Sequence, residues 1–318
     1  MGLKHRGILR IAYVRLGLND NRLKKSLAFY RDSFGMLESM RDTERAYLRC
    51  WHETFQYNLV LEQTEQNQLI EIGFQVRDQQ DLDQLSQRIE AAGVQVETSA
   101  ANEPLRGLSN SISFTIPGGQ RLRLFAEMEQ SGYVTGFESP DWVTPKELRG
   151  TAAPMFLNHV GLTSADPTAT VKFLTEVLEF TVSEKIVSDD KQLVSALLFR
   201  MCRDVGGQEL AIFPGEDNHL HHIAFTKEDP NDILVIGQYL RNDGIDIDTF
   251  GPTKQSYGNT FSMHFFDSFG IRLELCCGGR TIDAHPEYEA ITWTESELGK
   301  ALSYYDADVN PGFLDHSL

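Results

Sequence analysis

Extended apolar segments lead into amphipathic segments four times along the 318-residue chain. In each unit a strand-like apolar run precedes a stretch whose apolar positions recur at helical spacing, and further strand-like runs follow. The opening strands are predicted near Ile8 to Leu16, Leu69 to Val76, Phe156 to Leu162 and Leu220 to Phe225. The pattern predicts an α+β fold built from βαβββ units.

The apolar stripes identify the buried face of each predicted helix. The first helix ends at Gly35, a typical helix-terminating residue. We expect the four helices to bury, in chain order, Leu23, Leu27, Tyr30 and Phe34; Leu82, Leu85 and Ile89; Val171, Leu174 and Leu178; and Ile233, Ile236 and Leu240. The second and fourth units end on the strands Arg121 to Glu127 and Ile271 to Cys277.

The first two units match the last two, which indicates a duplicated chain. We predict an N-terminal domain of two units over residues 1–130 and a C-terminal domain of two units over 155–280. Met128 to Pro154 is the predicted linker, and residues 281–318 form a tail. Each half has the size of a small domain.

The duplication can be read at single positions. The segment I-A-Y-V-R-L sets Tyr13 against His159 in L-N-H-V-G-L. Likewise, L-I-E-I-G-F sets Glu71 against His222 in L-H-H-I-A-F, and G-Q-R-L-R-L-F sets Arg123 against Glu274 in G-I-R-L-E-L-C. Three matched positions therefore carry Tyr, Glu and Arg in the first half, and His, His and Glu in the second.

Alternation along a strand would point His159, His222 and Glu274 to the concave side of one sheet. Two imidazoles and one carboxylate form a facial triad, which binds a divalent metal and leaves coordination positions open. His221 is then expected to face the other side. A lone strand histidine is more often a structural polar residue than a ligand, but matched positions in a repeat favour ligands. Arg123 excludes the same site from the first half, so we predict one metal per chain.

The amino-acid composition limits which macromolecules and membranes the protein is expected to bind. Lys and Arg number 29 against 46 Asp and Glu, a net charge of −17, which disfavours nucleic acid and anionic membranes as partners. No apolar run is long enough to span a bilayer, and no secretory apolar core follows the first residues. Four cysteines are too few for a disulfide scaffold. We expect a cytoplasmic protein with reduced thiols.

At these residues the chain resembles the vicinal oxygen chelate superfamily and, within it, the two-domain type I extradiol dioxygenases of the catechol 2,3-dioxygenase type. The resemblance covers nearly the whole chain. It rests on the two histidine-bearing strands, the G-P-T-K loop at Gly251 to Lys254, the segment Phe265 to Gly279, and the tail Ile291 to Asp306. A glyoxalase-type relative is expected to lack that tail.

The resemblance implies an Fe(II) site, with Mn(II) possible, that a catechol chelates through both hydroxyl oxygens while dioxygen takes an open position. The ring would open beside the diol to give a muconic semialdehyde. Acid and base groups near the iron would take a catechol proton and later deliver one. The resemblance also implies a homotetramer and a tail that packs near the active site.

The chain departs from the family at three positions around the ligands. Two positions that carry His in the family fall on Gln208 and Gln255, and a family Tyr is replaced by His264. Glutamine forms hydrogen bonds but exchanges no proton near neutral pH. We therefore expect His264 to carry proton transfer, with His221 and Tyr257 as weaker candidates that contact the substrate. The alternative for His264 is a strand residue hydrogen-bonded to the backbone.

Two alternatives remain open from the sequence. The scaffold can keep its metal and catalyse redox-neutral chemistry, as an isomerase or a lyase. A metal-free binding protein is a third option, which requires an empty triad. The full-length resemblance and the tail favour ring cleavage of a small aromatic diol with O2.

Overall fold

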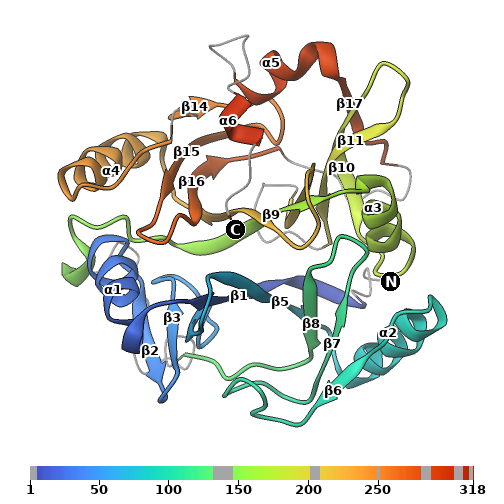
Figure 1. The fold of residues 1–318 in the computed structure, drawn as a ribbon, viewed down its shortest axis with the longest axis horizontal. Helices are drawn as coiled ribbons and strands as arrows, with labels where there is room; N and C mark the ends of the chain where they lie inside the picture. The colour runs from blue at the N-terminus through green and yellow to red at the C-terminus, as the bar shows by residue number, and fades with distance from the viewer. Residues whose placement is uncertain are drawn as a thin grey trace, which may run out of the picture.

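The computed structural model describes residues 6–131, 146–200, 208–248, 251–280, 288–303, 311–314 and 318. Two mixed β-sheets are stacked one above the other, the first half of the chain below and the second half above in the view of Figure 1. The predicted α+β fold and its paired βαβββ units are confirmed.

The first half forms an eight-stranded sheet in the order β2-β3-β4-β1-β5-β8-β7-β6. Its first unit comprises β1 (Ile8–Leu18), a helical segment, β2 (Leu37–Arg41), β3 (Arg45–Arg49) and β4 (Leu59–Gln63). Its second unit comprises β5 (Gln68–Val76), α2 (Gln79–Ala91), β6 (Glu97–Ser99), β7 (Ser111–Thr115) and β8 (Arg121–Phe125). The units meet where β1 and β5 pair antiparallel.

The second half repeats this plan in a nine-stranded sheet, β14-β15-β16-β13-β9-β12-β11-β10-β17. The third unit comprises β9 (Phe156–Ser164), α3 (Pro167–Glu176), β10 (Thr181–Val187), β11 (Leu193–Phe199) and β12 (Leu210–Pro214). The fourth comprises β13 (Leu220–Thr226), α4 (Pro230–Asn242), β14 (Thr253–Lys254), β15 (Thr260–Phe266) and β16 (Arg272–Gly278). The ninth strand, β17 (Ile291–Thr294), comes from the tail and pairs with β10. We propose the division 1–130, 155–280 and 281–318 on this basis.

The predicted helix stripes are buried in all four units. Local sequence explains where three helices begin, because Asp78, Asp166 and Asp229 each accept a hydrogen bond from a backbone amide of the first turn. The first helical segment is irregular: a 3-10 turn η1 (Asn21–Leu23), α1 (Lys24–Leu27) and a π-helical turn η2 (Ala28–Ser33). It ends at Gly35, whose φ of 82° favours glycine.

An apolar core joins the two halves. The ring of Phe34 lies 5.1 Å from that of Phe225 and 5.9 Å from that of Phe265, and Phe74 lies 5.6 Å from Phe180. Strands of the second sheet that carry site residues are therefore packed against the helices and strands of the first half.

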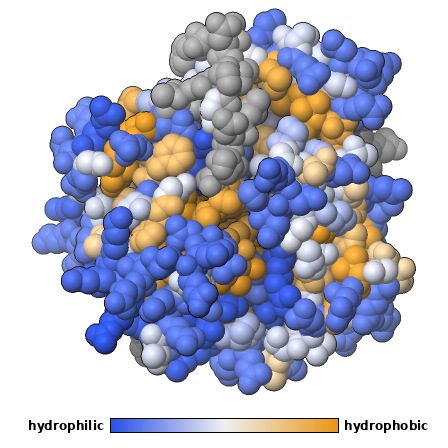
Figure 2. Space-filling view, viewed as in Figure 1, coloured by the Kyte–Doolittle hydropathy of each residue, from blue (hydrophilic) through white to orange (hydrophobic). Residues whose placement is uncertain are grey.

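Polar residues dominate the surface seen in Figure 2, with apolar patches between them. Three large apolar side chains of α4, Leu234, Val235 and Tyr239, are exposed by more than 40%. The tail continues through η5 (Glu295–Glu297), α5 (Leu298–Leu302) and α6 (Pro311–Leu314). In Figure 1 these helices lie over the second sheet, on the side away from the first half.

Candidate metal centre

Adjacent strands of the second sheet place the predicted site residues in one row. Glu274 on β16 lies opposite His264 on β15 and opposite Ala224 on β13, and Ala224 lies opposite His159 on β9. Residues directly opposite each other on paired strands point to the same face. His222 is two residues from Ala224 along β13, so it shares that face. The sheet register thus brings the triad together.

The three predicted ligands converge on one point. Nε2 of His159 lies 2.9 Å from Nε2 of His222, and Oε2 of Glu274 lies 3.4 Å and 3.2 Å from these two nitrogens. Atoms that each lie about 2.1 Å from one ion are about 3.0 Å apart at a right angle and about 3.4 Å apart at a tetrahedral angle. The observed separations therefore fit one shared divalent ion.

All three ligands are at least 97% buried, and within the described parts of the chain they form the one group of His, Cys, Asp and Glu able to hold a metal. Burial alone would raise the pKa of Glu274, but the neighbouring imidazoles of His264, His159 and His222 hold that pKa well below its ordinary value. Burial lowers the pKa of His222 to about 3. An ionised carboxylate beside a neutral imidazole is the donor set that a metal requires.

A hydrogen bond determines which ring nitrogen of His159 carries the proton. Its Nδ1 lies 2.7 Å from Oδ1 of Asn158, whose own amide donates to Oγ1 of Thr226 at 2.9 Å. Because Oδ1 accepts, Nδ1 carries the proton and Nε2 presents its lone pair to the ion. Asn158 was not predicted from the sequence, although it directly precedes the ligand.

His264 lies beside the triad. Its Nε2 is 3.4 Å from Oε2 of Glu274, the same distance as Nε2 of His159, and its side chain is 1% exposed. The imidazole therefore faces the carboxylate side of the centre rather than the backbone of its own strand.

A cavity of about 20 Å³ opens beside the ligands. This volume holds little more than one water molecule. The predicted Gln208, Gln255, Tyr257 and His264 all line it together with the triad. Its apolar wall comes from β11, β12 and the tail: Leu197, Ala211, Phe213, Leu302 and Phe313.

The polar lining residues are held by their neighbours. Nε2 of Gln255 donates to Oγ of Ser262 at 2.7 Å, and the amide of Gln208 lies 3.4 Å from Nδ1 of His159. The hydroxyl of Tyr257 lies 3.1 Å from Oγ of Ser195. Burial raises the pKa of Tyr257, so its hydroxyl stays protonated.

His221 differs from expectation. Its Nδ1 lies 2.7 Å from Nδ1 of His222, and it is fully buried behind that ligand instead of facing the other side of the sheet or the cavity. The physical reason is a β-bulge: Leu220 pairs with Leu162 but His222 pairs with Gly161, so one extra residue interrupts the alternation. Among the predicted substrate contacts, Tyr257 lines the cavity and His221 does not.

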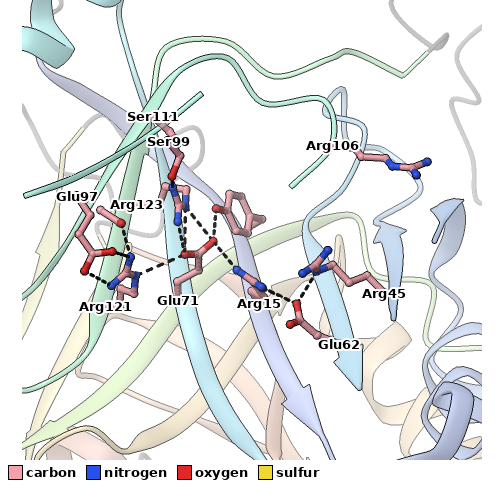
Figure 3. A network of polar contacts seen from close by, with 12 residues as sticks. Arg15, Arg45, Glu62, Glu71, Glu97, Ser99, Arg106, Ser111, Arg121 and Arg123 are labelled. Carbon is pink, nitrogen blue, oxygen red and sulfur yellow. Dashed lines mark hydrogen bonds and ion pairs between the residues drawn. The ribbon is translucent and has the colours of Figure 1, made fainter. Parts of the chain in front are cut away.

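The first half carries an ion-pair cluster at the place that corresponds to the triad of the second half (Figure 3). Arg123 lies opposite Gly73, which lies opposite Tyr13, so this row repeats the one that holds Glu274 and His159. Glu71, at the position of His222, receives hydrogen bonds from Arg123 at 3.1 Å and from the hydroxyl of Tyr13 at 2.9 Å.

A guanidinium takes the place of the metal in that cluster. Arg123 and Glu71 are both almost fully buried, and Nη1 of Arg15 lies 3.6 Å from Glu71. Arg15 lies opposite Glu71 on β1, as Gly161 lies opposite His222 on β9. These cationic side chains are the physical reason for the prediction that the first half does not hold the same metal site.

Family models match both halves of the chain. Residues 71–129 match the catechol 2,3-dioxygenase-like N-terminal domain, and residues 156–275 match the glyoxalase/bleomycin resistance protein/dioxygenase superfamily. In the described part of the chain, no helix has the length and apolar character to cross a membrane.

Relatives and solved structures match over almost the full length. The chain is 31% identical to a metapyrocatechase of Pseudomonas sp. (strain CF600), covering 97% of this chain and 98% of the relative. It is 26% identical to a manganese-dependent 2,3-dihydroxybiphenyl 1,2-dioxygenase of Geobacillus genomosp. 3, covering 93% and 94%.

Among solved structures, the 2,3-dioxygenase LapB from Pseudomonas sp. KL28 superposes with a TM-score of 0.83 at 25% identity, covering 92% of this chain and 99% of that one. Homoprotocatechuate 2,3-dioxygenase from Brevibacterium fuscum superposes with a TM-score of 0.85 at 24% identity, covering 100% and 95%, and shares the fold. With its triad and this full-length similarity to a metapyrocatechase, the chain belongs to the type I extradiol dioxygenases of the vicinal oxygen chelate superfamily.

Proposed function

We propose that this protein is an Fe(II)-dependent extradiol dioxygenase that opens the ring of a catechol or substituted catechol beside its diol. The observation that carries the proposal is the triad of His159, His222 and Glu274, whose donor atoms are 2.9–3.4 Å apart beside the cavity. Such a triad leaves positions open for two reactants. The product, a muconic semialdehyde, contains every atom of the diol and of O2, so the reaction needs no reductant.

Fe(II) is the proposed metal, with Mn(II) as the alternative. Two imidazoles and a carboxylate suit either ion, and one relative is named for its dependence on manganese. When bound, such an ion supplies chelation of both reactants and a path for electron density between them. Metal analysis of protein purified without added metal distinguishes the two ions.

The side chains around the triad orient the reactants and move the proton. Gln208 and Gln255 offer amide hydrogen bonds but exchange no proton near neutral pH. His264 has a ring nitrogen that can accept and release one, and it lies in the cavity wall at the carboxylate ligand. We assign proton transfer to His264, and a hydrogen bond to the bound ring to Tyr257.

The tail closes the site against water. Leu302 and Phe313 come from the tail and form part of the apolar wall. A cavity of about 20 Å³ cannot hold an aromatic ring, so the ring enters only when wall residues shift. Exclusion of water then strengthens the polar contacts to the diol.

Cytoplasmic location and a homotetrameric assembly complete the proposal. Three cysteines in the described residues, Cys50, Cys276 and Cys277, are buried thiols outside any disulfide, which fits a reducing compartment. The tetramer is carried over from the resemblance, and the mass of the purified protein in solution tests it.

Oxygen uptake tests the function. Protein loaded anaerobically with Fe(II) is mixed with a panel of catechols and ¹⁸O2, and we expect equal consumption of diol and O2 with both labelled atoms in the product. Conversion of the diols without oxygen uptake would support a redox-neutral isomerase or lyase instead. Loaded protein that converts none of them would overturn ring cleavage.

Substitution of His264 tests the assigned proton transfer. His264→Phe removes both ring nitrogens at similar volume, and we expect turnover to fall about 10²–10⁴-fold, the usual contribution of a positioned acid or base. His264→Tyr restores a hydroxyl that can donate a proton and should recover part of the rate. Unchanged turnover of His264→Phe across the pH range would show that another group moves the proton.

A further inference from the structure

A chain of hydrogen bonds connects a metal ligand to the backbone of the tail. Nδ1 of His222 lies 2.7 Å from Nδ1 of His221, and Nε2 of His221 lies 2.7 Å from the carbonyl oxygen of Phe313 in α6. Both distances are short for hydrogen bonds between nitrogen and its partners. The β-bulge makes the chain possible, because it places two consecutive imidazoles on the same side of β13.

The carbonyl oxygen of Phe313 fixes which atom donates in each of these two hydrogen bonds. A carbonyl oxygen only accepts, so Nε2 of His221 must carry a proton to bond Phe313. Nη1 of the Arg272 guanidinium lies 3.4 Å from Nε2 of His221, and a second positive charge on that ring would be repelled, so the ring is neutral. A neutral ring protonated at Nε2 has a lone pair at Nδ1, which accepts the proton of Nδ1 of His222.

The free lone pair of His222 then lies on Nε2, which is the atom that faces His159 and Glu274. The guanidinium of Arg272 does not reverse the direction of these hydrogen bonds. Its Nη1 lies 3.4 Å from Nε2 of His221 but 3.2 Å from the carbonyl oxygen of Phe313, and its Nε donates to Asp248 at 2.9 Å. The guanidinium thus holds the tail carbonyl in place beside His221.

We propose that His221 is a positioning residue that fixes the tautomer of His222, and that the carbonyl of Phe313 in the tail fixes the tautomer of His221. The tail therefore takes part in metal binding without contacting the metal. This inference rests on the proposed metal site and assigns His221 a role other than substrate contact.

The surroundings hold His221 in this orientation. Its ring stacks on Phe213 at 4.4 Å between centroids and meets the ring of Phe313 edge-on at 5.0 Å. The last residue, Leu318, exchanges two backbone hydrogen bonds with Leu220, the residue before His221. The tail is thus attached through Leu318 on one side of the Phe313 carbonyl, and through the bond from Arg272 to the carbonyl of Gly312 on the other side.

We call the two hydrogen bonds of His221, to His222 and to the carbonyl of Phe313, the relay. Two matched substitutions each remove one of these bonds and keep the other. His221→Asn places an amide oxygen near the position of Nδ1, so it keeps the acceptor for His222 and loses the bond to Phe313. His221→Gln places an amide nitrogen near the position of Nε2, so it keeps the bond to the tail and loses the acceptor. Each variant loses one side of the relay and remains polar, which makes each the control for the other.

Mn(II) affinity of the full-length protein is the primary measurement. We expect His221→Gln to bind Mn(II) about 10–100-fold more weakly than wild type, the usual effect of losing the partner of a ligating histidine. His221→Asn is expected to bind close to wild type. The ¹⁵N spectrum of labelled histidines in metal-free protein should show His222 protonated at Nδ1 in wild type and in His221→Asn, and a mixture of tautomers in His221→Gln.

The outcomes separate this inference from the function on which it rests. Equal Mn(II) affinity in all three proteins, or equal weakening in both variants, would overturn the relay while leaving the metal site in place. Wild-type protein that binds no Mn(II) and no Fe(II) would overturn the proposed function and, with it, the relay. Denaturant unfolding of the metal-free variants shows that any difference in affinity does not come from misfolding.

Discussion

Gly161 on β9 faces the ring of His222, and this contact supports a quantitative prediction. A Cβ atom at residue 161 would lie 2.5 Å from both Nδ1 and Cε1 of His222 and 3.3 Å from Cγ. Ordinary carbon contacts begin near 3.4 Å. The Gly161→Ala substitution must therefore displace the imidazole by about 0.9 Å, the difference between 3.4 and 2.5 Å, because β9 is fixed by pairing on both sides.

That displacement is large on the scale of metal coordination. Ligand distances in a working site hold within about 0.2 Å. A shift of this size also separates Nδ1 of His222 from His221, so we expect Gly161→Ala to bind Mn(II) at least about 100-fold more weakly than wild type. Titration of the metal-free protein, with the free ion followed by its electron paramagnetic resonance signal, measures the change.

Gly73→Ala in the first half is the matched control. Its Cβ would lie 2.0 Å from Cε1 of Tyr13, so the fold must adjust, but no metal ligand is in contact. We expect reduced stability with Mn(II) affinity retained. The reasoning fails if Gly161→Ala binds Mn(II) like wild type, or if Gly73→Ala weakens binding as strongly.

Three further predictions concern stability. Phe34→Ala removes a fully buried ring from the core that joins the halves and should lower the free energy of unfolding by about 3–5 kcal/mol in denaturant titrations, whereas a loss under 1 kcal/mol would contradict that role. Burial raises the pKa of Asp267, although the hydrogen bond that it accepts from Tyr30 at 2.8 Å lowers that pKa. Because the folded pKa is the higher one, the stability linked to this carboxyl group is full below the unfolded pKa and is lost as pH rises through the folded pKa. Unfolding across a pH series should show this fall in wild type and not in Asp267→Asn, and parallel curves would argue against it. Glu184→Ala removes a buried carboxylate that accepts three hydrogen bonds, including one from the tail residue Trp293. We therefore expect the free energy of unfolding to fall by about 3 kcal/mol and proteolysis of the tail to become faster. An unchanged digestion pattern would contradict this role of Glu184.

The triad could be predicted from the sequence because the duplication fixes its register. Two copies of one pattern showed which residue of each strand shares a face, and the sheet pairing places His159 and Glu274 in one row, as that alignment requires. The orientation of His221 could not be predicted in this way. A bulge adds one residue without changing the apolar pattern, and the simple alternation rule then assigns the wrong side.

The apolar wall of the cavity could be predicted only in part, because the resemblance implied a tail near the active site while the sequence pattern did not show the path of that tail. Leu302 and Phe313 reach the site from a tail whose path is set by contacts far apart in the sequence, such as the bonds from Arg272 to the carbonyls of Gly312 and Phe313. The irregular first helix is a similar case: its apolar spacing is helical, while Arg22 and Leu23 adopt positive φ values that spacing does not reveal.

The cluster around Glu71 has a consequence for how the two halves depend on their surroundings. In the first half the cation opposite the buried carboxylate is Arg123, which is covalently part of the chain. In the second half the corresponding cation must be taken up from solution opposite Glu274. We expect chelators, or scarcity of the ion in the cell, to destabilise the second half before the first. The supply of metal would then control the folding stability of only one of the two duplicated halves.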